Sequence, residues 1–319
     1  MLRSVPLLGL LSLVVPIGAW QDEAVRSPTL RVHVDRVDVG VVVTDSKGKF
    51  VEGLDRNDFA VYDNGALQTV TEFAPVDAPA EVLLLVEAGP AVYLLEDTHL
   101  LAAEALLKGL AAADRVAIAR YSDRPRILLD FTDNKRAAQS ALDEIPFTLG
   151  FAQLNLALSL NATLDWLNPL PGKKTILLLS TGVDSSSRES MRDLLARLET
   201  GDVRLLTVSL AGPVRTRKPG GPRTLSPAQE ALAEADAWLS TLAEATGGRA
   251  YFPENARDFE KTYREVAQLL RHEYSLAFAP PVADGKVHAL TVHVDRKSGP
   301  SPLYRLDHRK AYRAPAPEL

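Results

Sequence analysis

Hydrophobic and polar positions along the chain divide it into three regions, of which the first resembles a small β module. Between residues 30 and 75, β-branched residues alternate with polar ones, which is typical of half-buried strands. Two turn signals, at residues 45–48 and 63–65, separate the predicted strands. Asp63-Asn64-Gly65 is the stronger signal, because Asn and Gly accept the positive φ angles of a tight hairpin.

The middle region alternates apolar runs with amphipathic segments. Residues 82–86 and 175–179 are continuously apolar, as expected for strands that are covered on both faces. Such alternation predicts an α/β fold with a doubly wound, mostly parallel sheet, and residues 115–131 predict a hairpin at its edge. The other predicted elements are strands over 203–210 and 250–252 and helices over 94–110, 135–145, 154–167, 188–198, 227–245 and 259–270.

Alternating strands return near the C-terminus, over residues 274–278, 288–294 and 303–307. Because three short strands alone bury little surface, we expect them to pack with the N-terminal module. The α/β domain would then be inserted in a small β-sandwich. The expected divisions are a leader (1–20), an N-terminal β module (24–78), the α/β domain (79–272) and C-terminal strands (273–319).

The first twenty residues have the three-part layout of a secretory signal peptide. Arg3 precedes the apolar run VPLLGLLSLVVPI, and the small residues Gly18 and Ala19 come before a polar segment. An uncleaved anchor is the alternative, but the run is shorter than the ~20 residues needed to span a membrane. No later stretch is long and apolar enough to span. We therefore expect an exported protein, periplasmic or secreted, with no membrane span in its mature chain.

Composition and motifs exclude several classes of function. The formal net charge of −5 disfavours a nucleic-acid partner. The absence of cysteine excludes disulfides, thiolate metal sites and a cysteine nucleophile. The sequence contains no nucleophile elbow, P-loop, dinucleotide fingerprint or zinc-protease motif, so we expect neither an enzyme nor a cofactor. A hydrolase of unrecognised type stays open, because catalytic triads are assembled in space rather than in sequence.

Four phrases resemble those of the bacterial secreted VWFA-related proteins, which contain a von Willebrand factor A-like domain. They are VVVTDSKGKFVEGLDRNDFAVYDNG (41–65), LLLSTGVDSSS (177–187), TGGRAYF (246–252) and LRHEYSLAFAP (270–280). Each phrase is weak alone, but their order and spacing extend the resemblance over nearly the whole mature chain. The resemblance implies a β module, a von Willebrand factor A-like domain and closing strands.

The resemblance also implies a metal-ion-dependent adhesion site, in which hard oxygen donors at the carboxyl edge of the sheet hold Mg²⁺. All five donor positions are changed in this chain, so we expect a degenerate site that binds no metal. The segment Asp184–Ser187 contains an alternative Asp-x-Ser, but we interpret it as a helix N-terminus with a capping box of Ser186 and Glu189. The five changed positions are Glu87, Gly89, Ala91, Ala152 and Thr181.

Without a cation, Glu87 needs other support, which nearby helix N-termini could supply; otherwise it points to solvent. The six histidines are scattered and are expected to be solvated surface residues. His288 and His293 should face opposite sides of one strand.

The expected function is that of a non-enzymatic protein-binding or scaffold protein, with another extracytoplasmic protein as its partner. The alternative is a metal-dependent adhesion module with a rebuilt ion site. Basic residues cluster in a long loop over residues 211–226, which could dock an acidic partner. The candidate partner-binding residues are Glu87, Pro90, Phe151, Gln153, Thr181 and Asp184, together with Arg215, Arg217, Lys218 and Arg223 in that loop.

Overall fold

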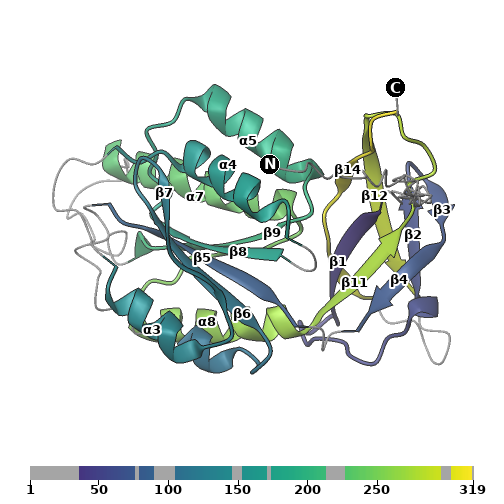
Figure 1. The fold of residues 1–319 in the computed structure, drawn as a ribbon, viewed down its shortest axis with the longest axis horizontal. Coiled ribbons are helices and arrows are strands. Elements are labelled where there is room, and N and C mark those ends of the chain that lie inside the picture. The colour runs from purple at the N-terminus through teal and green to yellow at the C-terminus, as the bar shows by residue number, and fades with distance from the viewer. Residues whose placement is uncertain are drawn as a thin grey trace, which may run out of the picture. The chain divides into compact units, whose positions relative to one another are not determined.

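The computed structural model describes residues 36–75, 79–89, 105–145, 153–170, 174–212, 227–295 and 303–317. These residues form one six-stranded mixed sheet and two four-stranded antiparallel sheets, with helices packed on the six-stranded sheet (Figure 1). The α/β class expected from the sequence is confirmed. The predicted leader lies outside the described residues.

The six-stranded sheet has the order β10-β9-β8-β5-β6-β7. All neighbouring strands are parallel except β6 and β7, which form the antiparallel edge hairpin predicted from the sequence. The strands are β5 (Glu81–Glu87), β6 (Arg115–Tyr121), β7 (Pro125–Thr132), β8 (Lys174–Ser180), β9 (Arg204–Ser209) and β10 (Ala250–Tyr251).

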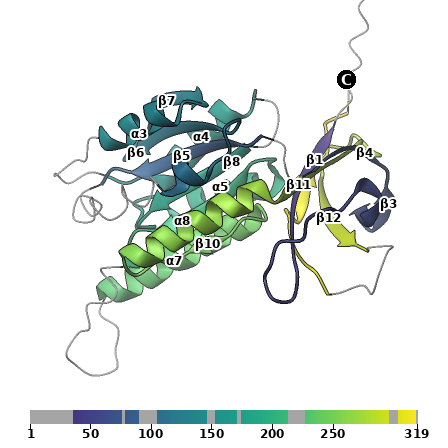
Figure 2. The ribbon, with the colours of Figure 1, turned by 90° about the horizontal axis from the view of Figure 1, so that it is seen from below.

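Helices cover both faces of this sheet. Alternate residues of β5 enter different cores: Leu84 and Val86 join one, while Leu83 and Leu85 join the other. This double burial explains why the strand is apolar throughout. Figure 2 shows α8 in front of the sheet. One face carries α3 (Lys135–Asp143) and α8 (Ala256–Arg271), and the other carries α4 (Leu156–Leu167), α5 (Arg188–Thr200) and α7 (Pro227–Ala245). We call the strands β5–β10 and their helices the α/β part.

The predicted capping box before α5 is wrong by one residue. Ser187 has extended backbone angles and is the N-cap, and its Oγ accepts a hydrogen bond from Ser190 N at 3.1 Å. Ser186 instead donates from its Oγ to Asn155 Oδ1 at 2.9 Å. Asn155 caps α4, which begins two residues later than the apolar pattern predicted.

The two antiparallel sheets have the orders β13-β1-β11-β4 and β14-β12-β2-β3. Strands from the two ends of the chain pair directly, because β1 lies between β11 and β13, and β12 pairs with β2. Both sheets contribute to one core. The N-terminal strands are β1 (Val37–Thr44), β2 (Phe59–Asp63), β3 (Ala66–Gln68) and β4 (Val70–Ala74); the C-terminal strands are β11 (Glu273–Phe278), β12 (Val287–Val294), β13 (Arg305–Asp307) and β14 (Ala311–Arg313). We call these eight strands the β part.

The hairpin signal at Asp63-Asn64-Gly65 is confirmed. Asn64 and Gly65 have φ angles of 46° and 83°, and the turn joins β2 to β3. Strand β14 was not predicted. None of the described helices is long and apolar enough to cross a membrane.

Candidate functional site at the carboxyl edge of the sheet

Glu87 is the last residue of β5, and its side chain is completely buried. Its carboxylate accepts hydrogen bonds from the hydroxyl of Ser180 at 2.8 Å and from the backbone N–H of Thr181 at 2.8 Å. The Thr181 hydroxyl lies 2.9 Å from one carboxylate oxygen and 3.0 Å from the other. Both oxygens of Glu87 are therefore engaged by groups of the protein itself.

Three strand ends converge on this carboxylate because of the parallel register. Glu87 pairs with Tyr121 across β5 and β6, and Val86 pairs with Leu179 across β5 and β8, so residues 180 and 181 follow beside Glu87. The Tyr121 hydroxyl lies 2.7 Å from Ser180 Oγ and 3.3 Å from the Glu87 carboxylate. We call Glu87, Tyr121, Ser180 and Thr181 the strand-end network.

Burial dominates the electrostatics of this network. It raises the pKa of Glu87 above the ordinary value, although the hydrogen bonds from Thr181, Ser180 and Tyr121 act in the opposite direction. Burial, followed by the neighbouring Glu87 carboxylate, raises the pKa of Tyr121 well above its ordinary value. The tyrosine hydroxyl thus stays protonated and available as a donor.

The hydroxyls of the strand-end network also fix the loop that follows β8. Gly182 N donates to Ser180 Oγ at 2.8 Å, and Val183 N donates to Thr181 Oγ1 at 3.3 Å. Gly182 has a φ of +72°, and a Cβ there would lie 2.9 Å from the backbone oxygen of Ala235 on α7. Only glycine lets the loop approach α7 this closely.

The metal ion that the family resemblance implies does not fit these residues. Mg²⁺ requires an octahedral set of hard oxygen ligands, but the only carboxylate of the strand-end network already accepts protein donors. Leu154 packs over Gly89, and a Cβ at Gly89 would lie 2.9 Å from Leu154 Cδ2. Within the described residues, no three His, Asp or Glu side chains are grouped so that they could hold an ion.

The structure brings together three of the sequence-predicted site residues, Glu87, Gly89 and Thr181, at the carboxyl edge of the sheet. The expectation that Glu87 points to solvent or rests on helix N-termini is wrong, because hydroxyls at strand ends satisfy it. The sequence reasoning missed Tyr121 and Ser180. Their signal in the sequence was their position at the ends of apolar strand runs, the same position that Glu87 has.

The remaining candidates divide into described and undescribed residues. Gln153 is exposed. Asp184 is partly buried: its Oδ1 accepts from Leu156 N at 2.9 Å, and its Oδ2 has no hydrogen-bond partner among the described residues. The candidates that lie outside the described residues are Pro90, Ala91, Phe151, Ala152, Arg215, Arg217, Lys218 and Arg223.

A groove of about 260 Å³ lies between the loop after β8 and helix α7. Its apolar lining includes Met191, Ala235 and Trp238, and Val183 at its border is 44% exposed. This volume is below the ~300–1,000 Å³ of usual small-molecule sites, so the groove has room for side chains of a partner rather than for a large cofactor.

The expectation that the histidines are solvated is wrong for His288 and His308, which are buried in the β part. His288 and His293 do face opposite sides of β12, as predicted. Hydrogen-bonding partners inside the β part make burial of these rings possible. His33 and His99 lie outside the described residues.

The chain matches no known family model and no curated protein sequence. Solved structures do resemble it. A von Willebrand factor type A structure from Catenulispora acidiphila is 11% identical, covers 90% of this chain and 76% of its own, and has a TM-score of 0.48.

Two further similar structures come from Bacteroides. An aerotolerance-related membrane protein from Bacteroides fragilis is 14% identical and covers 60% of this chain and 98% of its own, with a TM-score of 0.45. BatB from Bacteroides thetaiotaomicron is 13% identical with the same coverages and a TM-score of 0.43. The structures that this chain resembles thus include a von Willebrand factor type A protein, and at these identities they indicate nothing about activity.

Proposed function

We propose that this chain is a non-enzymatic, exported protein-binding or scaffold protein with a von Willebrand factor A-like domain that works without metal. One observation carries the proposal: both carboxylate oxygens of Glu87 accept hydrogen bonds from Ser180 and Thr181, so the protein supplies the stabilisation that an ion would give. None of the described histidines joins this network, which supports a binding role over hydrolysis.

The proposal also covers the architecture: a doubly wound α/β domain inserted in a β-sandwich. Helices on both faces of the six-stranded sheet support a doubly wound domain. The pairing of β1 with β11 and of β2 with β12 supports its insertion between the two halves of a β-sandwich.

The strand-end network would act indirectly in binding. Glu87 and Thr181 are buried and present no surface to a partner. They hold the loop of residues 182–187, which places Val183 and the groove beside Trp238 at the surface. An exposed apolar side chain next to a groove is the arrangement from which protein interfaces are built. We propose this loop and groove as the docking surface for the protein partner.

Metal independence is tested by titrating the purified chain with Mg²⁺ and Mn²⁺ in a calorimeter and by thermal melts with and without a chelator. We expect no binding heat and no shift of Tm. A ligand held at about 100 times its Kd would stabilise the chain by ~2.7 kcal/mol, which a melt detects easily. A saturable stabilisation by Mg²⁺ that disappears in Glu87→Gln would instead favour the metal-dependent adhesion module.

The docking surface is tested by comparing retention of envelope proteins on immobilised wild type and two matched variants. Val183→Asp places a charge beside the groove, whereas Val282→Asp places the same charge in the β part, where the side chain is 51% exposed. We expect only Val183→Asp to lose a protein that wild type retains. Equal loss in both variants, or loss in neither, would contradict the assignment of this surface.

A further inference from the structure

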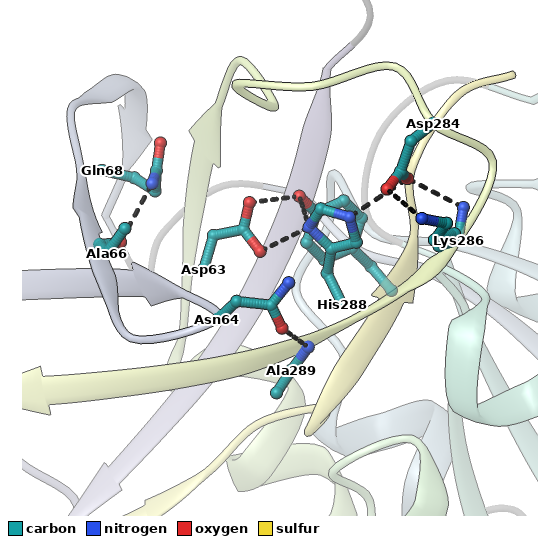
Figure 3. A network of polar contacts seen from close by, with 9 residues as sticks. Asp63, Asn64, Ala66, Gln68, Asp284, Lys286, His288 and Ala289 are labelled. Atoms are coloured by element: carbon teal, nitrogen blue, oxygen red, sulfur yellow. Dashed lines mark hydrogen bonds and ion pairs between the residues drawn. The ribbon is translucent and has the colours of Figure 1, made fainter. Parts of the chain in front are cut away.

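His288 lies between two carboxylates in the β part (Figure 3). Its Nδ1 is 2.7 Å from Asp63 Oδ1 at the end of β2, and its Nε2 is 3.2 Å from Asp284 Oδ1 in the segment before β12. His288 is only 6% exposed, and Asp63 is similarly buried. Each ring nitrogen therefore faces an acceptor of negative charge.

This geometry selects the imidazolium form of His288. A neutral imidazole has one N–H and one lone pair, so one of its nitrogens would direct a lone pair at a carboxylate. The imidazolium ion donates from both nitrogens. Burial lowers the pKa of His288, but Asp63 and Asp284 outweigh burial and raise this pKa above its ordinary value.

Further groups satisfy the two carboxylates. Tyr312 on β14 donates its hydroxyl to Asp63 Oδ2 at 2.9 Å, and the backbone N–H of Lys286 donates to Asp284 Oδ1 at 2.9 Å. The Lys286 ammonium is 3.8 Å from Asp284. Asp63, Asp284 and Lys286 thus carry the charges around the ring. Arg309 lies two residues before β14 and acts on Tyr312, and Arg313 is the last residue of β14 and donates to Gly285 O.

The cluster joins the C-terminal segment to the rest of the β part. Strand β14 pairs only with β12 among the described strands, over three residues that include His288 opposite Tyr312. Tyr312 is buried edge-on against Phe278. After β14, Ala314 N donates to Lys286 O, and Gly285 N donates to Pro315 O. So short a strand depends on the side chains that anchor it.

We propose that the Asp63–His288–Asp284 cluster is a pH-sensitive latch that holds β14 and residues 314–317 on β12 while His288 is charged, and releases them when it loses its proton. On deprotonation, one ring nitrogen no longer donates, and a buried carboxylate loses a partner. The proposal does not depend on the metal-free site.

The direction of the pH dependence follows from the sign of the shift. His288 binds its proton more tightly in the folded chain than in the unfolded chain, so it stabilises the latch fully below the ordinary histidine pKa of 6.5. This stability is lost as the pH rises through the raised pKa of the folded state. The latch is therefore closed in mild acid and opens in alkali.

The cysteine-free chain allows a direct test by thiol labelling. Ala314→Cys places a thiol at a buried position, 3% exposed, and Ala316→Cys places one at an exposed position of the same segment. Each variant is reacted with a disulfide reagent between pH 6 and 9. The ratio of the two rates removes the intrinsic pH dependence of the thiolate. We expect the reactivity of Cys at position 314, relative to Cys at position 316, to rise severalfold over this range, because loss of the His288 proton releases the segment that covers position 314.

Matched variants separate the latch from general loosening. His288→Gln should abolish the pH dependence of the ratio, and Asp284→Asn should move its midpoint to lower pH. His272→Gln removes another histidine that faces a carboxylate, with Nε2 at 2.7 Å from Glu52, and should change nothing. A ratio that is flat in wild type, or a pH dependence that survives His288→Gln, would overturn the proposal.

A second measurement requires no substitution. In the wild-type chain, imidazole ¹⁵N shifts follow the protonation of His288, and the amide signals of β14 follow its release. We expect both to change with one midpoint above pH 6.5. A His288 ring that titrates while the amides of β14 stay unchanged would show a structural ion pair without a latch.

Discussion

Arg204 and Glu273 form a buried ion pair between the α/β part and the β part. Arg204 Nη2 lies 3.2 Å from Glu273 Oε1, and the two side chains are only 5% and 8% exposed. Arg204 also donates to the backbone oxygens of Gly40 on β1 and of Gly247 after α7. Gly40 is needed here, because a Cβ at that position would overlap the Glu273 carboxylate.

Removal of the arginine should therefore be strongly destabilising. Arg204→Ala removes the cation that faces the buried Glu273 carboxylate, and we expect a loss of about 3–5 kcal/mol in the free energy of unfolding. Arg188→Ala is the matched control, because its bridge to Glu234 joins side chains that are 76% and 55% exposed, and such pairs contribute about 0–1 kcal/mol. Urea unfolding of both variants measures the difference, and equal effects would contradict it.

The free energy of unfolding should fall more when the Glu87 carboxylate is removed than when Thr181 loses only its methyl group. Glu87→Ala removes the acceptor for the Ser180 hydroxyl and for the backbone N–H of Thr181. Each buried donor left without an acceptor destabilises by about 1–3 kcal/mol. Thr181→Ser keeps the hydroxyl and should lie within ~1 kcal/mol of wild type. Equilibrium unfolding in urea compares the two variants. A loss of less than ~1 kcal/mol in Glu87→Ala would mean that the strand-end network adds little stability.

The apolar patterns predicted the strands and helices of the α/β part well, because strands buried on both faces and amphipathic helices have distinct periods. Residues 82–86 are apolar throughout, which predicts a central strand that is covered on both faces. Strand β14 escaped prediction because Ala311–Arg313 is too short for any period, and its pairing depends on the distant strand β12, where His288 lies opposite Tyr312. Whether such a short strand forms depends on tertiary contacts rather than on the local sequence.

The position of Glu87 at the end of an apolar run could be predicted from the sequence, but its hydrogen-bond partners could not. The hydrogen bonds of Tyr121 and Ser180 to one another and to Glu87 arise from the register of three strands, which no local pattern encodes. Burial of His288 likewise depends on Asp63, which lies far away in the sequence and is brought beside the ring by the pairing of β12 with β2.

Introducing a serine at position 89 should be unfavourable. A Cβ there meets the end of the Leu154 side chain, which must shift to admit it. We expect Gly89→Ser to destabilise by about 1–3 kcal/mol, as overpacking of a filled site does. In the Leu154→Ala background, the same substitution should be less harmful. A double-mutant cycle by thermal or urea unfolding measures this coupling, and strict additivity would show that the two side chains do not compete for space.

His308 gives a pH dependence of the opposite sign to that of His288. Its Nδ1 lies 2.6 Å from the backbone oxygen of Arg309, and its Nε2 is 3.2 Å from the Lys310 ammonium, an arrangement that suits a neutral ring. Burial, and then the charge of Lys310, lower the pKa of His308 to about 4. The folded chain thus binds this proton less tightly than the unfolded chain.

Neutral His308 should contribute its full stabilisation when the pH is above 6.5, the ordinary histidine pKa. This contribution should be lost as the pH falls toward 4, the lowered pKa of His308 in the folded chain. The loss should reach about 2–3 kcal/mol. Unfolding free energies between pH 4 and 7 measure it, and His308→Gln should flatten this part of the profile. If His308→Gln keeps the full wild-type slope, other groups are responsible for the acid sensitivity.

The leader prediction can be checked by mass. If residues 1–20 form a signal peptide, the exported protein should begin between Trp20 and Asp22. Intact-mass measurement of the exported chain decides this, and a retained Met1 would contradict it.

The pairing of β1 with β11 and β13 has a consequence for synthesis. Val42 on β1 can pair with Asp307 only after the 264 residues between them have been synthesised, whereas β5 and β8 of the α/β part can pair earlier. The valines of β1 therefore remain without a neighbouring strand until β11 has been synthesised, and during that time they are open to chaperones or to aggregation. A chain whose synthesis stops before β13 leaves β1 without one of its two partner strands. The unpaired edge of β1 then distinguishes the truncated chain from the folded one, and quality-control factors can recognise it.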